Sequence, residues 1–117
     1  MSKPSDLPLY LAVYKLLKYF YNLVAQFPKS YKHTLGESII NLTWQILDYV
    51  LEANALPNNE KVDSIRKSSV TFDKLKIRLR LAHELKLIND RRYAYLLKEN
   101  EEIGKMLSGW QKWAEKA

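Results

Sequence analysis

Few side chains in this sequence could carry out catalysis. His33 and His83 are the only histidines, and neither has a carboxylate at a recognisable metal-ligand spacing. Ser38 and Ser68 have no histidine at a spacing that would identify the base of a serine nucleophile. The three glycines lie inside expected helices, so no phosphate-binding loop is predicted. We therefore expect a protein with no catalytic residue, no metal and no cofactor.

An acidic cluster offers the one alternative to this expectation. Glu99, Glu101 and Glu102 could in principle hold a divalent ion for nuclease chemistry. Adjacent positions on a helix point apart, and lysines flank the cluster, so a solvated charged face is the favoured interpretation. A metal-dependent nuclease is the third and weakest functional hypothesis.

Basic side chains are concentrated in the second half of the chain. The net charge is +6, and residues 60–117 carry 14 Lys and Arg against nine acids, whereas residues 1–59 carry five against four. Such a surplus suits an anionic partner, although it also favours solubility alone. The candidate residues for binding nucleic acid or a partner are Lys74, Lys76, Arg78, Arg80, His83, Lys98, Lys105 and Lys112. No groove-reading motif is visible, so we expect electrostatic recognition without base-specific contacts.

Four amphipathic segments must position these side chains. Apolar residues recur at three- and four-residue steps over residues 9–26, 30–55, 59–88 and 90–115, and Pro- or Asn-containing breaks separate these segments. A chain of 117 residues predicts a single domain, residues 1–117. The fold we expect is all-α, an antiparallel up-and-down four-helix bundle.

The sequence leaves the start of the second helix undecided and shows one interruption in the apolar stripe of the last helix. The second helix could begin at Ser30, or at Thr34, which forms a possible capping box with Glu37. The last helix has an inward stripe that includes Leu97 and is interrupted by a single polar residue, Asn100. On the opposite side of that helix, lysines seven residues apart should form an outward ridge.

The second and third helices carry more apolar surface than one bundle can cover. The third helix has a core stripe that contains Phe72 and Leu79, and a second apolar set on a different side that runs from Val70 to Ile88. Unpaired apolar faces of this kind indicate subunit contacts. We therefore predict a homo-oligomer whose interface contains Ile40, Trp44, Leu47, Leu51, Val70, Ile77 and Leu81.

The sequence gives no indication of secretion or membrane insertion. Residues 1–8 are polar and contain two prolines, and Lys15 and Lys18 interrupt the apolar run that follows. No run of about 18 uncharged apolar residues occurs. The absence of Cys is compatible with a reducing compartment. We expect a cytoplasmic protein without a membrane partner.

Short motifs along the chain resemble those of a known family. They are Phe27-Pro28-Lys29, Leu35-Gly36 with Ile39, Leu56, Asp73-Lys74-Leu75, Leu79-Arg80-Leu81-Ala82, Ile103-Gly104-Lys105-Met106-Leu107 and Gly109-Trp110. On these residues the chain is similar to the accessory variability proteins of diversity-generating retroelements. These are relatives of the four-helix-bundle proteins encoded in 23S rRNA intervening sequences. The resemblance covers about residues 10–113, and the last two motifs favour the accessory variability branch.

The resemblance implies a non-catalytic protein that assembles as a ring-like homopentamer. Such a protein would bind the reverse transcriptase of the retroelement and engage its template RNA, with DNA as a second candidate ligand, during mutagenic cDNA synthesis. The basic positions of the family on the third helix correspond to Lys76, Arg80 and His83, where His83 replaces an expected Arg. The alternative, from a different functional class, is a structural or adaptor bundle with no direct nucleic-acid role.

Overall fold

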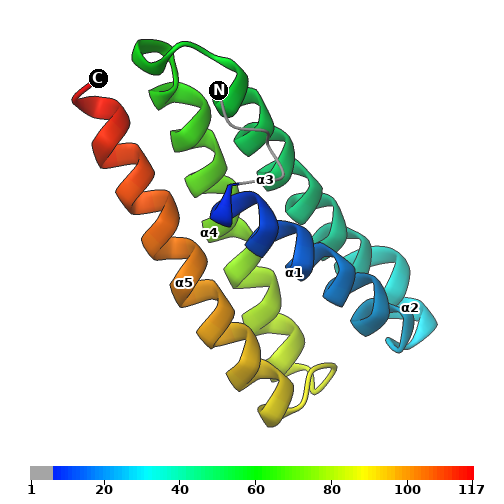
Figure 1. The fold of residues 1–117 in the computed structure, drawn as a ribbon. Helices are drawn as coiled ribbons and strands as arrows, with labels where there is room; N and C mark the ends of the chain where they lie inside the picture. The colour runs from blue at the N-terminus through cyan, green and yellow to red at the C-terminus, as the bar shows by residue number, and fades with distance from the viewer. Residues whose placement is uncertain (1–6) are drawn as a thin grey trace.

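The computed structural model describes residues 7–117, and these residues form helices without any strand. The four long helices are α1 (Pro8–Ala25), α3 (Glu37–Ala55), α4 (Val62–Glu84) and α5 (Asp90–Glu115). Shorter segments connect them: α2 (Lys29–Tyr31) and the π-helix η2 (Lys32–Gly36) precede α3, and the 3-10 helix η3 (Asn58–Glu60) precedes α4 (Figure 1). The all-α prediction is confirmed.

The long helices form a bundle in which successive helices run in opposite directions (Figure 1). Helix α1 packs against α3 and α5, and α4 packs against the same two helices, so α1 and α4 lie diagonally across the bundle. The molecule measures 45 × 21 × 21 Å, as expected for helices that are nearly aligned. This arrangement matches the predicted four-helix bundle.

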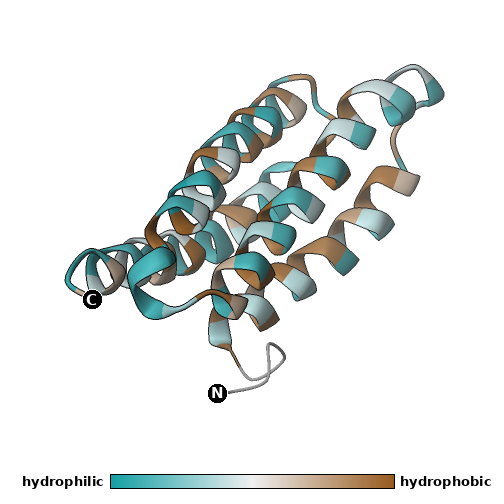
Figure 2. Ribbon diagram, turned by 90° about the horizontal axis from the view of Figure 1, so that it is seen from above, coloured by the Kyte–Doolittle hydropathy of each residue, from teal (hydrophilic) through white to brown (hydrophobic). Residues whose placement is uncertain are grey.

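The core lies along the bundle axis and is formed by the apolar stripe of each helix. Figure 2 shows apolar and polar stretches alternating along the helices, as amphipathic sequences require. The largest fully buried side chains include Phe20, Ile39, Ile46, Ile65, Leu75, Leu79, Leu96, Ile103 and Leu107. The periodicity of the sequence predicted most of this stripe correctly.

Helix α4 ends four residues earlier than the predicted helix 59–88. Lys86 has a positive φ of 63°, and its amide donates a hydrogen bond to the carbonyl of His83. The amide of Leu87 reaches back to the carbonyl of Ala82 at 2.9 Å, which completes a Schellman motif. Because the chain turns here, Ile88 returns to the core instead of extending the second apolar set of α4.

The start of the second helical segment uses neither of the two predicted caps. The helix begins at Lys29, after Pro28, and the Thr34 hydroxyl donates to the carbonyl of Ser30 at 3.0 Å instead of capping a free amide. Gly36 is buried in the π-helix that follows. A Cβ at this position would lie 2.4 Å from Cγ1 of Val24. The glycine therefore permits the close approach of α1.

A buried lysine holds the end of α3 to the start of α4. The ammonium of Lys61 donates hydrogen bonds to the carbonyls of Ala53 at 2.7 Å, Asn54 at 3.2 Å and Leu56 at 2.6 Å. These contacts satisfy carbonyls that the last turn of a helix leaves without partners. Burial lowers the pKa of Lys61. The charged ammonium is nevertheless the form that fits this site, because it alone has three N–H donors for the three carbonyl acceptors.

Candidate nucleic-acid interface

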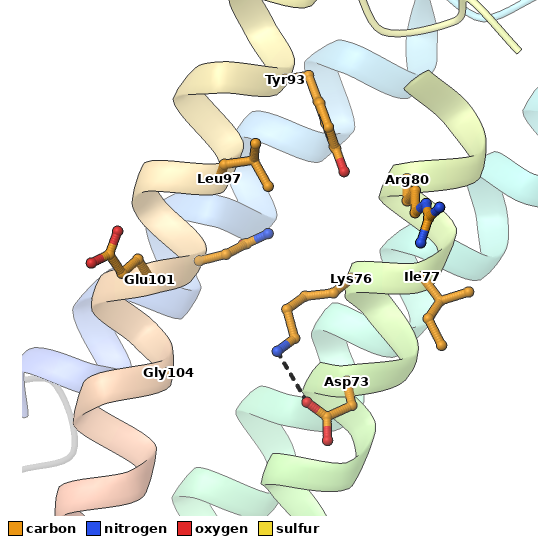
Figure 3. A pocket seen from close by; sticks show the side chains of 9 residues that line it. Asp73, Lys76, Ile77, Arg80, Tyr93, Leu97, Glu101 and Gly104 are labelled. Carbon is orange, nitrogen blue, oxygen red and sulfur yellow. Dashed lines mark ion pairs between the residues drawn. The ribbon is translucent and has the colours of Figure 1, made fainter. Parts of the chain in front are cut away.

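Helices α4 and α5 enclose an open groove of about 600 Å³ on the surface of the bundle (Figure 3). Helix α4 contributes Asp73, Lys76, Ile77 and Arg80, and helix α5 contributes Tyr93, Leu97, Asn100, Glu101 and Gly104. The groove forms because α4 and α5 are neighbours and both are amphipathic: their core stripes meet inside, and the residues at the edges of these stripes line the channel outside. Two predicted binding residues, Lys76 and Arg80, therefore share one concave surface.

Both cations of the groove have acidic neighbours on their own helix. Lys76 Nζ lies 3.1 Å from Oδ1 of Asp73 and 4.8 Å from the ring centroid of Phe72, and Arg80 Nε lies 3.8 Å from Oε1 of Glu84. All four charged side chains are largely exposed. Exposed pairs of this kind contribute about 0–1 kcal/mol, so an incoming phosphate can replace the carboxylate at low cost.

Two contacts hold the His83 side chain, so it is less available to a ligand than Lys76 and Arg80. Its ring stacks on Tyr93 with centroids 4.1 Å apart and an interplanar angle of 12°. Its Nε2 lies 2.7 Å from Oδ1 of Asp90, in the first turn of α5. These contacts join the end of α4 to the start of α5. The geometry thus gives His83 a role in positioning Tyr93 at the end of the groove.

The other predicted cations of α4, Lys74 and Arg78, do not line the groove. Arg78 donates from Nε to the hydroxyl of Ser38 and from Nη1 to the carbonyl of Lys74, both at 3.3 Å. Lys74 is exposed and forms no ion pair with any residue in the range 7–117. Of the four predicted cations Lys74, Lys76, Arg78 and Arg80, only Lys76 and Arg80 line the groove.

The predicted ridge on α5 lies on the outer face of the bundle. Lys98, Lys105 and Lys112 are all exposed, and their seven-residue spacing aligns them along the helix. Lys105 lies 3.4 Å from Glu101, which also lines the groove. The ridge and the groove consequently share one helix and lie on adjacent sides of it.

The residues predicted at an oligomer interface differ in position and in exposure. Val70, Ile77 and Leu81 form an exposed patch on the outer face of α4, with Ile77 64% and Leu81 46% exposed. Trp44 is 42% exposed and lies on the side of α3 that faces α1. Ile40 and Leu51 are half-buried beside it, against the core.

Leu47 does not belong to either exposed patch, because the structure places it in the core at 3% exposure. The helical period places it on the same side of α3 as Ile40 and Leu51, but it does not give how far the neighbouring helices cover that side. Leu97 differs in the opposite direction. It was expected to point inward and is 52% exposed at the groove.

A second basic pocket was missed by the sequence analysis. Arg91 and Arg92, in the first turn of α5, line a hollow of about 450 Å³ with Tyr19, Tyr95 and Asn89. The two tyrosine rings lie 5.1 Å apart, and burial raises the pKa of Tyr19 while Arg92 acts in the opposite direction. Two arginines in the first turn after the Asn89 cap are a signal in the sequence, but Tyr19 on α1 cannot be paired with them from spacing alone.

Within the described residues, no group of three potential metal ligands occurs, and no helix combines the length and apolarity needed to cross a bilayer. A family model described as bAvd-like matches residues 10–114. No curated protein and no solved structure matches the chain. The match covers nearly the whole of the four long helices, including the groove and the ridge.

Proposed function

Because the chain belongs to the bAvd-like family, we propose that it is a non-catalytic accessory protein of a diversity-generating retroelement. In this role it binds the reverse transcriptase and its template RNA and supports mutagenic cDNA synthesis. The basic surface of α4 and α5 is the part of the molecule that engages RNA. The neighbouring apolar patches serve subunit assembly.

The observation that carries this proposal is the position of the cations beside exposed apolar residues. Lys76 and Arg80 line a groove whose rim includes Ile77, and the α5 lysines follow on the next face. Phosphates bind such surfaces by releasing condensed counterions, so each added cation strengthens the interaction. When a subunit is repeated in an assembly, a modest charge per chain becomes a multivalent surface.

Two separate apolar patches suit a ring better than a two-fold dimer. A two-fold contact uses the same patch on both subunits, whereas a ring uses two different patches that meet head to tail. Trp44 lies on the α1 side of α3, and Ile77 and Leu81 lie on α4, which is not adjacent to α1. The homopentamer implied by the family resemblance is the closed ring that we propose.

One observation favours the alternative, an adaptor bundle with no nucleic-acid role. Lys76, Arg80 and Lys105 each have a carboxylate within 4 Å, which is typical of an ordinary solvated surface. In that case the positive charge would serve solubility alone.

The proposal can be tested by co-purification. The tagged protein is expressed with the reverse transcriptase and template RNA of the same retroelement, and captured complexes are analysed for both. Recovery of the enzyme and the RNA, with cDNA synthesis that depends on the accessory protein, is the expected result. Capture of neither, with cDNA synthesis unchanged when the protein is omitted, would support the adaptor.

A further inference from the structure

The pocket between α1 and the start of α5 is separate from the groove and from the assembly patches. It has a volume of about 450 Å³ and is lined by Tyr19, Asn89, Arg91, Arg92 and Tyr95. None of these residues lines the groove between α4 and α5, and none belongs to the exposed apolar patches on α3 and α4. Assembly through those patches therefore does not use the residues of this pocket.

The two arginines of this pocket have no acidic partner. Neither guanidinium lies within 4 Å of a carboxylate of residues 7–117, whereas both cations of the groove pair with one. Asp90, the acid next to them in the sequence, lies 2.7 Å from His83 instead. Arg92 donates from Nη1 to Oε1 of Gln26 at 3.1 Å, which orients the guanidinium and leaves its other donors available. The pocket thus holds two positive charges that no described carboxylate balances.

Two guanidiniums in one pocket suit a phosphate monoester better than a phosphodiester. A monoester carries a charge of about −1.5 to −2 at pH 7 and presents three acceptor oxygens. Each phosphodiester of a nucleic-acid strand carries only a single charge. Arginine binds phosphate oxygens in bidentate pairs. The amide of Arg92 already donates to Oδ1 of Asn89 at 2.8 Å, so the arginine side chains are the donors that a ligand would meet.

Tyr19 and Tyr95 give the pocket an aromatic wall beside the arginines. Both side chains are half-buried, and their ring centroids lie 5.1 Å apart with the planes inclined at 39°. This is the spacing of two rings in direct contact, so a base can stack against the wall but not between the rings. An aromatic wall next to a site for a phosphate monoester matches a nucleotide.

We infer that this pocket binds a nucleoside 5′-phosphate, with Arg91 and Arg92 on the phosphate and the base against Tyr19 and Tyr95. The ligand is either a free nucleotide or the phosphorylated 5′ end of a single strand. The inference goes beyond the proposed function, because it concerns a separate site. It adds recognition of a strand end to the electrostatic binding by α4 and α5.

The experiment compares two oligoribonucleotides of about 12 residues, within the length that single-strand binding sites span. Both carry a 3′ label, and they differ only in a 5′-phosphate or a 5′-hydroxyl. Fluorescence anisotropy should show that the wild-type protein binds the phosphorylated oligomer about five- to tenfold more tightly. A phosphorylated oligomer with an abasic first residue should lose part of this gain, because it has no base to stack on the tyrosines.

The double variant Arg91→Gln/Arg92→Gln should bring the ratio of the two affinities to about one, with unchanged helicity by circular dichroism. Lys98→Gln/Lys105→Gln is the matched control, since it removes the same charge from exposed positions of the same helix. It should weaken the binding of both oligomers equally and keep their ratio, because contacts with internal phosphates do not depend on the strand end. The same fall in the ratio in both double variants would overturn the inference.

Calorimetry with adenosine 5′-monophosphate and adenosine distinguishes the two sources of the ligand. Binding of the monophosphate alone, lost in Arg91→Gln/Arg92→Gln, would extend the site to free nucleotides. A preference for the phosphorylated oligomer without binding of the monophosphate would restrict it to strand ends.

Equal binding of both oligomers, with no binding of the monophosphate, would overturn the inference and leave the proposed function standing. If neither oligomer bound while the monophosphate did, the proposed function would fail and the inference would stand. A phosphotyrosine peptide that bound more tightly than both the monophosphate and the phosphorylated oligomer would overturn the inference in favour of a protein ligand.

Discussion

The indole nitrogen of Trp44 donates a hydrogen bond to the hydroxyl oxygen of Tyr21 at 3.0 Å, between α3 and α1. Both side chains remain largely exposed, so the bond fixes an aromatic surface without burying it. A tryptophan held in one orientation at the surface loses little conformational entropy when a partner covers it. This pair is therefore the centre of one of the two patches that we assign to subunit assembly.

The first prediction concerns that assembly. Trp44→Glu and Leu81→Glu should each convert the oligomer into a helical monomer of 13.8 kDa, because a carboxylate in either patch opposes burial. Light scattering after size-exclusion chromatography measures the mass, and circular dichroism reports the helix content. Gln45→Glu, an exposed change on the same helix as Trp44, is the control that should stay assembled. A wild-type mass equal to one chain would refute the assembly.

The second prediction separates assembly from folding at α3. Leu47→Ala should lower the free energy of unfolding by about 2–5 kcal/mol, because it removes a core side chain and leaves a cavity. Trp44→Ala, at an exposed position one turn earlier, should lower the free energy of unfolding of the isolated chain much less. Urea denaturation at a concentration where the protein is monomeric distinguishes the two. Equal losses would contradict the burial that the structure gives to Leu47.

The third prediction tests the close approach of α1 to the second helical segment. Gly36→Ala should destabilise the fold by about 1–3 kcal/mol, because the added Cβ would meet the buried Val24. Gly109→Ala, where the Cβ meets no atom within 4 Å, should stabilise it by about 0.5–1 kcal/mol through helix propensity. Thermal unfolding of both variants gives the comparison. If contact with Val24 causes the loss, adding Val24→Ala should restore part of the stability lost in Gly36→Ala.

The fourth prediction concerns the connection between α3 and α4. Lys61→Met should lower the free energy of unfolding by about 1–3 kcal/mol, because the carbonyls of Asn54 and Leu56 lose the Lys61 donor and Ala53 keeps only the Leu56 amide, while the side-chain volume is kept. Lys67→Met is the matched control, since Lys67 is exposed and pairs only with Asp63, an interaction of about 0–1 kcal/mol. If chemical denaturation gave the same loss for both variants, the carbonyl contacts of Lys61 would not contribute as described.

Sequence periodicity predicted the helices and most of the core because both depend on local spacing. The stripe that contains Phe72 and Leu79 is buried as expected, and Pro8 begins α1 as a proline at a first turn should. Periodicity gives the angle of a side chain around its helix, but not how far a neighbouring helix extends over that side. Leu47 and Leu97 were misplaced for this reason.

Other features depend on contacts between distant segments and had no local signal. The left-handed turn at Lys86 ends α4, although lysine is not a residue typical of that conformation. Asn100 stood out in the sequence as a polar interruption, but only the structure shows that its oxygen is buried without a donor from the described residues. The candidate site was thus predicted as a set of charges, while its concave shape was not.

The most direct test of the central claim is the salt dependence of RNA binding. Anisotropy of a labelled single-stranded RNA, measured between about 50 and 200 mM salt, should show affinity falling steeply with ionic strength. In Lys76→Gln/Arg80→Gln, the slope of log K against log salt should be shallower by about 1.4, from about 0.7 for each lost phosphate contact. Lys18→Gln/Lys29→Gln, with the same change in charge at exposed positions that belong to neither α4 nor α5, should retain the wild-type slope. No binding at about 50 mM salt, or the same slope in both double variants, would contradict the account.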